Sequence, residues 1–361
     1  DNKIYRFADD KIGELLIDKP DNFEAIRLMM SDREGNLWIG TKTGGLNRYD
    51  PKTDKFEKWN LPTADAAEIN ITFIYEDSKR DIWIGTYKNG LFRLNQKKNT
   101  IAHWQNYQGK EKILTDNFVT SIVEDQFSNI WVGTYNGLSK YIPNERGFPF
   151  KEVVPELKIP VWYLSKSSFY KNNIWIGTFN GLKRLDLNSG KIVDVKIPDK
   201  QGLNFGSSVS SVTEEKYLDN KILWISTFDG LVRINLTTGY EERFVENKNQ
   251  DSDLLSNEIH EVMLDKSGVI WIATENGLNF YSSKSSKFNF RIPTIGKILD
   301  QPELFNNSIR AITQSNNKSL WFGTESGLYE VRNKNIELVE SKELKSLNVW
   351  SLCKGSTNQI W

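Results

Sequence analysis

The sequence contains very little cysteine and histidine, and it carries no surplus of charge. Its 361 residues include one Cys, two His, and 47 basic against 47 acidic residues. One Cys excludes a disulfide framework and a cysteine-ligated metal site, and two His cannot supply the three imidazoles of a histidine metal centre. A neutral chain lacks the basic surplus that drives nucleic-acid binding. We therefore expect no metal, no cofactor and no contact with nucleic acid.

Long apolar runs are also missing. No run approaches the roughly 18 residues that a membrane-spanning helix needs. The chain begins at Asp1 with neither Met nor an apolar signal region, so we expect that any targeting peptide has been removed. Aromatic residues are abundant instead, with 12 Trp, 13 Tyr and 19 Phe. Twelve Trp in a hydrophilic chain require an explanation.

Most of the tryptophans belong to an internal repeat. Each of the first seven repeat tryptophans is followed by an apolar residue, a small residue and Thr, as in the two WIGT blocks at Trp38 and Trp83. A Gly-Leu pair comes shortly after each block. The repeat positions, 40 to 50 residues apart, are Trp38, Trp83, Trp131, Trp175, Trp224, Trp271, Trp321 and Trp361. Such a period indicates a repeat architecture.

Each unit contains four segments with the pattern of β-strands. An alternating apolar segment such as Ile71–Asp77 comes first, then a polar turn, the Trp segment, a Gly turn, a Leu-x-Arg/Lys segment and a last β-like stretch such as Thr100–Trp104. Alternation punctuated by Gly, Asn and Asp is typical of hairpins. Four antiparallel strands per unit predict an all-β fold, a β-propeller of seven four-stranded blades, with eight as the alternative.

The repeated residues are expected to be architectural. The Trp fills the space between neighbouring blades, and the small residue two positions later leaves room for a neighbouring ring. The Gly supplies the positive φ of a hairpin turn. Asp six residues before Trp, at 32, 77, 125 and 265, suits a turn held by Asx hydrogen bonds. A motif repeated seven times cannot mark a single active site.

Ring closure is predicted from the two chain ends. Seven complete units are followed by an eighth that stops at Trp361, and an isolated strand around residues 3–7 precedes the first unit. We expect this N-terminal strand to complete the last blade. The propeller then spans residues 1–340, and residues 341–361 begin a following repeat or second propeller, so that the natural protein continues beyond Trp361.

The string Asp-x-x-Gly-x-Leu-Trp-Ile-Gly-Thr-x-x-Gly-Gly-Leu-x-Arg, from Asp32 to Arg48, resembles the repeat of the two-component-regulator propeller family. It is most similar to the periplasmic sensor regions of hybrid two-component systems in polysaccharide-degrading Gram-negative bacteria. Seven of the eight units match from Trp to Gly-Leu, so the resemblance covers essentially the whole chain. The first strands and turns near residues 168–173, 214–221 and 314–319 lack the Asp-x-x-Gly turn.

The resemblance implies a layout and a function. Family members have two successive propellers and an immunoglobulin-like module outside the inner membrane, then a membrane helix, a histidine kinase, a receiver and a DNA-binding domain. This chain looks like the first propeller. The implied function is recognition of an oligosaccharide in the periplasm, which biases a signalling homodimer and regulates polysaccharide-utilisation genes. The second propeller and the immunoglobulin-like module would be its partners within the same chain.

Candidate ligand-binding residues gather at one face of such a ring. The loops between blades and the turns between second and third strands share that face, and the long, dissimilar loops span residues 61–69, 107–117, 198–208, 247–258 and 293–308. Aromatic rings can stack on sugar faces, and arginines near the first strands could face an acidic sugar. The candidates are Arg27, Trp59, Tyr87, Trp104, Tyr135, Trp162, Phe179, Phe228 and Arg310; for the aromatic ones, structural packing between blades is the competing interpretation. Trp350 is not among them.

Catalysis and protein binding are the alternatives. Glycosidases also use propellers and need paired carboxylates, but the Glu-Asp pairs here, such as Glu76-Asp77, fall at the repeated turns on the opposite face and look solvated. His103 and His260 each lack a repeated Asp or Ser partner. Cys353 is expected to be a buried apolar residue. We therefore predict a non-enzymatic sensor propeller, with a protein-interaction scaffold or, less favoured, a glycan-degrading propeller as alternatives.

Overall fold

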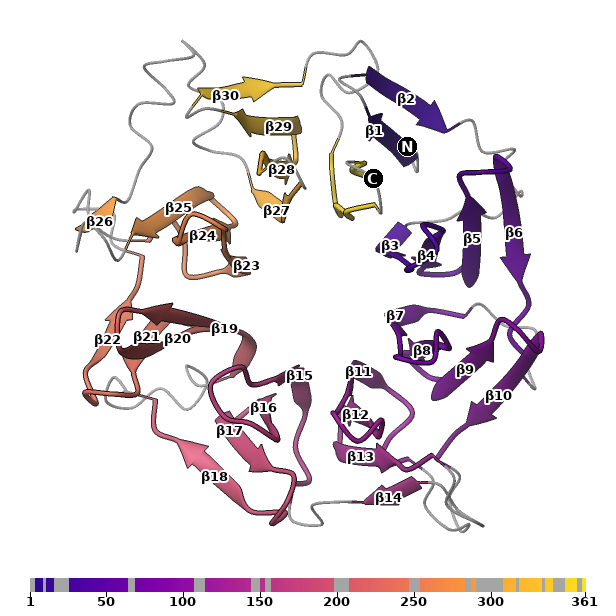
Figure 1. The fold of residues 1–361 in the computed structure, drawn as a ribbon, viewed down its shortest axis with the longest axis horizontal. Coiled ribbons are helices and arrows are strands. Elements are labelled where there is room, and N and C mark those ends of the chain that lie inside the picture. The colour runs from indigo at the N-terminus through magenta and orange to yellow at the C-terminus, as the bar shows by residue number, and fades with distance from the viewer. Residues whose placement is uncertain are drawn as a thin grey trace.

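The computed structural model describes residues 4–8, 11–15, 26–63, 69–106, 114–143, 150–152, 157–197, 208–246, 254–282, 287–289, 308–315, 318–332, 335–339, 348–355 and 359–361. All regular secondary structure in these ranges is β, and seven four-stranded antiparallel sheets stand in a ring around one axis (Figure 1). The predicted seven-bladed β-propeller is confirmed. Within the described ranges, no helix has the length and hydropathy to cross a lipid bilayer.

Every blade consists of four consecutive strands, so each sheet is a simple meander. The first three blades are β3–β6 (Ile26–Ser31, Leu37–Thr41, Leu46–Asp50, Lys55–Trp59), β7–β10 (Ile71–Glu76, Ile82–Thr86, Leu91–Asn95, Thr100–Trp104) and β11–β14 (Val119–Glu124, Ile130–Thr134, Gly137–Tyr141, Phe150–Glu152). The fourth and fifth are β15–β18 (Val161–Lys166, Asn173–Thr178, Gly181–Asp186, Ile192–Val195) and β19–β22 (Val209–Tyr217, Asn220–Thr227, Gly230–Asn235, Glu241–Phe244). The sixth and seventh are β23–β26 (Ile259–Leu264, Val269–Thr274, Gly277–Ser282, Lys287–Asn289) and β27–β30 (Ile309–Gln314, Leu320–Thr324, Gly327–Arg332, Asn335–Leu338).

The repeat tryptophans form the core between blades. Each of the eight hydrophobic clusters around the ring contains one repeat Trp, from Trp38 between the first two blades to Trp361 beside the first blade. None of the eight is more than 9 % exposed. Each buried indole removes roughly 150–250 Å² from water. The eight tryptophans are therefore one packing position repeated, as predicted.

The aspartates of the turns accept hydrogen bonds both from these indoles and from the backbone of their own turns. In the second blade, Asp77 accepts hydrogen bonds from the backbone N–H groups of Lys79 and Asp81 and from Nε1 of Trp83, at 2.8–2.9 Å. The same arrangement recurs at the other three predicted aspartates, 32, 125 and 265. The Asx turns are confirmed, and the hydrogen bond from Trp explains the six-residue spacing.

Two blades without the aspartate use glutamates in its place. Trp175 Nε1 donates to Glu214 of the next blade at 2.7 Å, and Trp224 Nε1 donates to Glu215 of its own blade at 2.8 Å. A buried indole N–H without an acceptor would cost the desolvation of that donor. The departures from the Asp-x-x-Gly turn in the fourth and fifth blades are thus compensated by carboxylates on β19.

The small residue two positions after Trp allows neighbouring blades to approach closely. A Cβ added to Gly85 would lie 2.6 Å from Val119 Cγ1, and a Cβ at Gly40 would lie 2.7 Å from Ile71 Cγ2. The prediction of a small residue at a tight interface is confirmed, but its neighbour is a β-branched aliphatic side chain of the next first strand and not an aromatic ring. The seven turn glycines adopt φ between +72° and +140°, as predicted for the hairpins.

The ring closes through both chain ends, in a way that differs from the prediction. The seventh blade has its own fourth strand, β30, and the N-terminal strand β1 (Ile4–Ala8) pairs with β2 (Lys11–Leu15) in a separate two-stranded sheet. The N-terminal strand does lie at the closure, but it does not complete the last blade. The C-terminal segment lies beside it, between the seventh and first blades (Figure 1).

The C-terminal segment packs like the inner part of an eighth blade. Val349 contacts Gly323 of the seventh blade as Val119 contacts Gly85, and the backbone groups of Cys353 and Trp361 form two hydrogen bonds of 2.8–2.9 Å. Trp361 packs against Ile4 and Tyr49. The proposed domain boundary after residue 340 lies outside the described residues.

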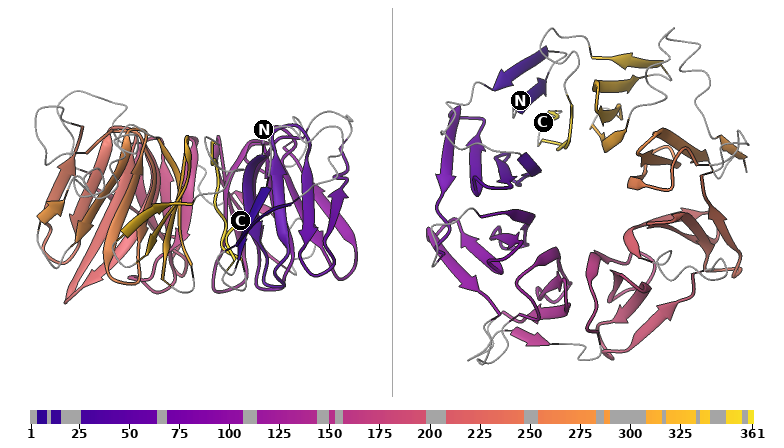
Figure 2. Two further views of the ribbon diagram at one scale, coloured as in Figure 1. Left: turned by 90° about the horizontal axis from the view of Figure 1, so that it is seen from above. Right: turned by 180° about the vertical axis from the view of Figure 1, so that it is seen from behind.

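The ring has two different faces, and the strands run between them in the side view of Figure 2. We call the face that carries the Thr–Gly turns and the ends of the fourth strands the loop face. The opposite face carries the Asp turns, and we call it the turn face.

Candidate functional site

The first strand of every blade carries a β-bulge at its loop-face end. The pairing register with the second strand shifts at the residue after the first apolar one in all seven blades. Bulges re-aim a side chain out of the sheet pattern and often occur next to functional sites. The bulged residues are Arg27, Thr72, Thr120, Trp162, Ser210, His260 and Arg310. Three of the nine candidates, Arg27, Trp162 and Arg310, therefore share one structural position.

The residue after the repeat Thr forms a second series beside the first. In the second to seventh blades its backbone N–H donates to the carbonyl just before the first strand, at 3.0–3.3 Å, as Tyr87 does to Asn70. This bond ties the turn to the start of the first strand and confirms that they share a face. The series reads Lys42, Tyr87, Tyr135, Phe179, Phe228, Glu275 and Glu325. Four more candidates, all aromatic, thus lie on the loop face.

Aromatic side chains of the second to fourth blades contact one another there. Tyr87 meets Phe118 with ring centroids 4.7 Å apart, and Phe118 stacks on Tyr135 at 5.8 Å with 12° between the planes. Tyr135 meets the edge of Trp162 at 5.9 Å. We call these four residues the aromatic arc. Tyr87 and Tyr135 remain 43 % and 50 % exposed, so the arc keeps open ring faces.

Phe118 was not among the candidates predicted from the sequence. It precedes Val119, the first apolar residue of β11, and its carbonyl accepts the N–H of Tyr135. Its place before the first strand is the signal that could have found it. At the position after the repeat Thr, Phe228 in the fifth blade is 62 % exposed and Phe179 in the fourth is half-buried. With Tyr87 and Tyr135, aromatic residues therefore follow the repeat Thr in four consecutive blades.

Charged side chains take over in the sixth and seventh blades. Arg310 Nη2 donates to Glu325 at 2.8 Å, and Arg310 Nη1 lies 3.3 Å from the Glu275 carboxylate. His260 Nε2 lies 2.8 Å from the same carboxylate, which also accepts the Ser308 hydroxyl at 2.9 Å. We call these five residues the charged cluster. The hydrogen bond from His260, together with Ser308 and the nearby Arg310 charge, lowers the pKa of Glu275.

His260 therefore has partners that the sequence did not reveal, since Glu275 follows it by 15 residues and Ser308 by 48. One group of described residues could hold a metal ion, and it is Glu258, His260 and Glu275, whose ligand atoms lie within 4.8 Å of one another. Arg310 Nη1 lies 3.3 Å from both His260 Nε2 and Glu275 Oε2. A divalent cation there would face the guanidinium charge, so the set does not suit a metal.

Arg27 occupies the bulge of the first blade, whereas Trp59 and Trp104 lie at the ends of outer strands. Arg27 is exposed and donates to the Asn70 side chain at 2.8 Å, which links the first two blades. Trp59 and Trp104 end their outer strands and are half-buried against repeat tryptophans. Trp59 lies 6.0 Å from Trp38, and Trp104 stacks on Trp83 at 5.7 Å. The structure does not bring these two indoles to the aromatic arc.

Most of the long interblade loops, at 64–68, 107–113, 198–207, 247–253 and 290–307, lie outside the described residues.

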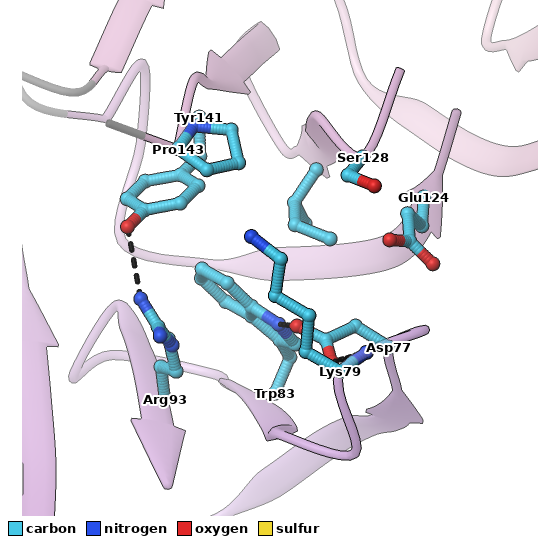
Figure 3. A pocket seen from close by; sticks show the side chains of 9 residues that line it. Asp77, Lys79, Trp83, Arg93, Glu124, Ser128, Tyr141 and Pro143 are labelled. Carbon is cyan, nitrogen blue, oxygen red and sulfur yellow. Dashed lines mark hydrogen bonds between the residues drawn. The ribbon is translucent and has the colours of Figure 1, made fainter. Parts of the chain in front are cut away.

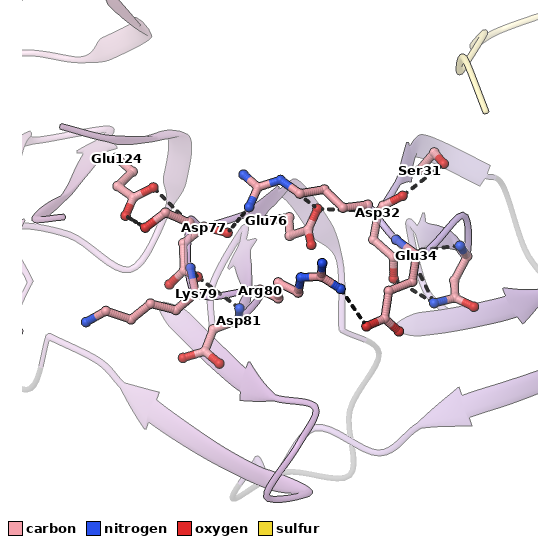
Figure 4. A network of polar contacts seen from close by, with 12 residues as sticks. Ser31, Asp32, Glu34, Glu76, Asp77, Lys79, Arg80, Asp81 and Glu124 are labelled. Carbon is pink, nitrogen blue, oxygen red and sulfur yellow. Dashed lines mark hydrogen bonds and ion pairs between the residues drawn. The ribbon is translucent and has the colours of Figure 1, made fainter. Parts of the chain in front are cut away.

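The paired carboxylates on the turn face are structural, but the expectation that they are solvated is wrong. Asp77 and Glu124 are 4 % and 5 % exposed. Glu124 accepts the Ser78 backbone N–H at 2.8 Å and the Ser78 hydroxyl, and Glu76 accepts the Arg33 N–H at 2.9 Å (Figure 4). Each glutamate thus fastens the turn of the preceding blade. Burial raises the pKa of Glu76.

A small cavity lies above one of these turns. Lys79, Trp83, Arg93 and Tyr141 are among the residues that line it, between the second and third blades (Figure 3). Its volume is ≈ 60 Å³, far below the roughly 300–1,000 Å³ of pockets that hold small molecules. An oligosaccharide does not fit there.

The two remaining reactive side chains are also held by packing. His103 stacks on Phe92 with centroids 4.0 Å apart, and its Nε2 lies 2.7 Å from the Asn89 carbonyl oxygen. Cys353 is partly buried at the ring closure, where its sulfur accepts the Ser31 N–H at 3.1 Å. Burial raises the pKa of the Cys353 thiol to about 11, which keeps the thiol protonated and unreactive at neutral pH.

Solved structures with the same fold come from proteins of different function. The extracellular domain assigned to a hybrid two-component system of B. thetaiotaomicron aligns over 99 % of this chain and 52 % of its own length, with 16 % identity and a TM-score of 0.52. An inactive variant of virginiamycin B lyase from Staphylococcus aureus aligns over 85 % of this chain and 94 % of its own, with 16 % identity and a TM-score of 0.54. The Dos1 propeller reaches a TM-score of 0.62 at 9 % identity, over 93 % of this chain and 92 % of its own. These likenesses show the fold alone.

The chain spans about half the length of the two-component structure that it matches. No curated protein sequence matches it. The model of the family described as two component regulator propeller matches residues 67–88, 113–136, 253–276 and 303–326. Each matched segment runs from an interblade loop through the bulged strand and the Trp strand to the second residue after Thr. Four of the seven blades therefore carry the two-component-regulator propeller repeat, which confirms the resemblance seen in the sequence.

Proposed function

We propose that this chain is a ligand-sensing propeller of a hybrid two-component system and that it recognises an oligosaccharide with its loop face. The observation that carries the proposal is the aromatic arc. Its rings are partly exposed and contact one another across three blades. A sugar ring has faces rich in C–H groups, and these pack well on aromatic faces.

The pattern of repeated and unrepeated residues supports the same location. Trp, Thr and Gly recur in all seven blades, whereas the bulged residue and the residue after Thr change from blade to blade. The varied positions lie at the same two places of every blade, on the loop face. Such a set of positions can be complementary to one particular ligand.

In the whole protein, we infer that the propeller lies in the periplasm, beside a second propeller and an immunoglobulin-like module. Ligand binding would bias a homodimer whose histidine kinase and DNA-binding domain control polysaccharide-utilisation genes. The propeller itself would bind without catalysis. This proposal rests on the family repeat in four blades and on the likeness to an extracellular domain of a two-component system.

Calorimetric titration of the 361-residue chain with a panel of neutral and acidic oligosaccharides tests the proposal. We expect saturable binding without product formation, and Tyr135→Ala combined with Trp162→Ala should weaken it about 100-fold, since each lost stacking contact contributes roughly 1.4 kcal/mol. Phe127→Ala is the matched control, because Phe127 is 54 % exposed on the turn face of the same blade as Tyr135. Turnover of a bound glycan would contradict the sensor proposal, and no binding across the panel would favour a protein-interaction scaffold.

A further inference from the structure

A second cluster on the loop face combines an exposed indole with planar polar groups. Trp350 is 59 % exposed, and the Arg310 guanidinium lies 5.0 Å from its ring centroid. Trp350 follows Val349, as Arg310 follows Ile309 and Trp162 follows Val161. It therefore occupies the position of the bulged residue in the eighth place around the ring.

The backbone around Trp350 is fixed by the ring closure. The Val349 N–H donates to the Thr324 carbonyl at 2.8 Å, and Val349 packs on Gly323. The indole is thus held beside Glu325, the residue after Thr324. Trp350 was not among the candidates predicted from the sequence. Its place directly after the first apolar residue of its unit is the signal that could have identified it.

The charge of this region does not suit an anion. Among the described residues of this region, the guanidinium of Arg310 is already shared by the carboxylates of Glu275 and Glu325, and the carboxylate of Glu258 is exposed nearby. A carboxylate or sulfate group on a ligand would meet these oxygens and would have to displace them from Arg310. Such like-charge contacts are costly at an interface. The hypothesis that Arg310 faces an acidic sugar is not favoured by this geometry.

Neutral hydroxyl groups suit the same atoms well. A sugar hydroxyl can donate to Glu275 or Glu325 and can accept from Arg310 or His260. The indole of Trp350 supplies the flat apolar surface for the opposite face of the sugar ring. Stacked aromatic surface beside fixed donors and acceptors is what a pyranose ring with several hydroxyls requires.

We propose that Trp350 and the charged cluster form a second subsite, which binds a neutral, hydroxyl-rich sugar residue and rejects uronate or sulfate groups. This inference rests on the proposed function, since it assigns one end of the oligosaccharide. The aromatic arc binds the remainder through stacking. The charged cluster, through its hydrogen bonds, determines which sugar the sensor accepts.

The experiment compares each neutral oligosaccharide of the panel with the same oligosaccharide after its primary hydroxyls are oxidised to carboxylates. We expect the wild-type chain to bind the best neutral ligand at least about 10-fold more tightly than its oxidised form. Glu275→Gln combined with Glu325→Gln leaves the Arg310 charge uncompensated and should reduce that ratio to below about 3-fold. Trp350→Ala should weaken binding of the neutral ligand about 10-fold.

Glu34→Gln is the charge-matched control, because Glu34 forms an exposed ion pair with Arg80 on the turn face; it should leave the ratio unchanged. Equal or tighter binding of the oxidised ligands by the wild type overturns the subsite. So does unchanged binding in Trp350→Ala when the Tyr135→Ala, Trp162→Ala variant has lost it, and in that case the proposed function still stands. If no oligosaccharide binds to the wild type, both proposals fail together.

Discussion

The turn face and the loop face of the ring are built from the same seven repeats, yet their side chains differ. The turn face carries repeated, buried side chains, and the loop face carries side chains that vary from blade to blade. On the turn face the repeated aspartates are buried and saturated with hydrogen bonds, as Asp77 and Asp125 show. On the loop face the equivalent positions of successive blades carry different side chains, from Tyr135 to Glu275, and several are exposed. A position that is repeated serves the fold, and a position that varies is free to serve recognition.

The glutamates of the turn face sharpen this contrast. The sixth residue of the first strand accepts a backbone N–H from the turn of the preceding blade in four blades. These residues are Glu76, Glu124, Glu214 and, with an amide oxygen, Gln314. These bonds join neighbouring blades at one face. At the loop face the polar contacts between the sixth and seventh blades are instead made by side chains that remain accessible to solvent.

The largest effect is expected from removing a turn aspartate. Asp77→Ala leaves the Trp83 indole N–H and two backbone N–H groups without their acceptor in a buried site. Because each unsatisfied buried donor costs about 1–3 kcal/mol, we expect a loss of about 3 kcal/mol in the free energy of unfolding. Urea unfolding monitored by Trp fluorescence measures it.

A loop-face substitution is the comparison for Asp77→Ala. Tyr135→Ala should change the free energy of unfolding by less than about 1 kcal/mol, because half of that side chain is already in water. Similar losses for the two variants would contradict the division into a structural face and a recognition face.

Much of the fold could be predicted from the sequence, because the seven copies of the repeat can be compared with one another within the chain. The Trp, the small residue and the turn Gly recur at fixed spacing in all seven blades, and the Asp recurs in four of them. Each has one structural role, which several blades test together. The partners of Trp175 and Trp224 could not be predicted in this way. Their acceptors, Glu214 and Glu215, lie on one strand that departs from the repeat.

The candidate site was only partly predictable, because it depends on contacts between blades. The repeat register places Trp162, His260 and Arg310 directly after the first apolar residue of their strands, but the alternation of these strands does not reveal the bulge that re-aims their side chains. The pairing of His260 with Glu275 joins the first strand of the sixth blade to the turn after its second strand. Trp59 and Trp104 are residue types expected at a sugar site, but each packs against a repeat tryptophan.

A smaller effect is expected from the close contact between blades. Gly85→Ala would place a methyl group 2.6 Å from Val119 Cγ1, so the neighbouring blade must shift, at a cost of about 2 kcal/mol. The sixth blade has Ala273 at the equivalent position. Ala273→Gly should cost about 1 kcal/mol, through backbone entropy. Urea unfolding of both variants decides whether overpacking at the repeat position exceeds this ordinary cost, and a smaller loss for Gly85→Ala would show that the ring can expand.

The smallest expected effect is the pH dependence of stability from one glutamate on each face, and its sign should differ between the two faces. The pKa of Glu76 on the turn face is raised by burial, whereas the pKa of Glu275 on the loop face is lowered, first by the hydrogen bond from His260. The contribution of Glu275 to stability is therefore present above the ordinary carboxyl pKa and is lost as the pH falls through its folded value. For Glu76 the relation is reversed, since folding favours its protonated form and stability decreases as the pH rises through its folded value.

The free-energy cost of each Glu→Gln substitution, measured by urea unfolding at pH 7 and at pH 4, reports these signs separately from all other carboxylates. From pH 7 to pH 4 the cost of Glu275→Gln should shrink, because the wild type loses what the ionised carboxylate contributes. The cost of Glu76→Gln should grow, because the wild type gains from protonation and the amide cannot. Both changes should be below about 1 kcal/mol. Changes of the same sign would mean that the loop-face carboxylate is held as the turn-face one is, and a binding surface that is buried in this way could not exchange its hydrogen bonds for those of a ligand.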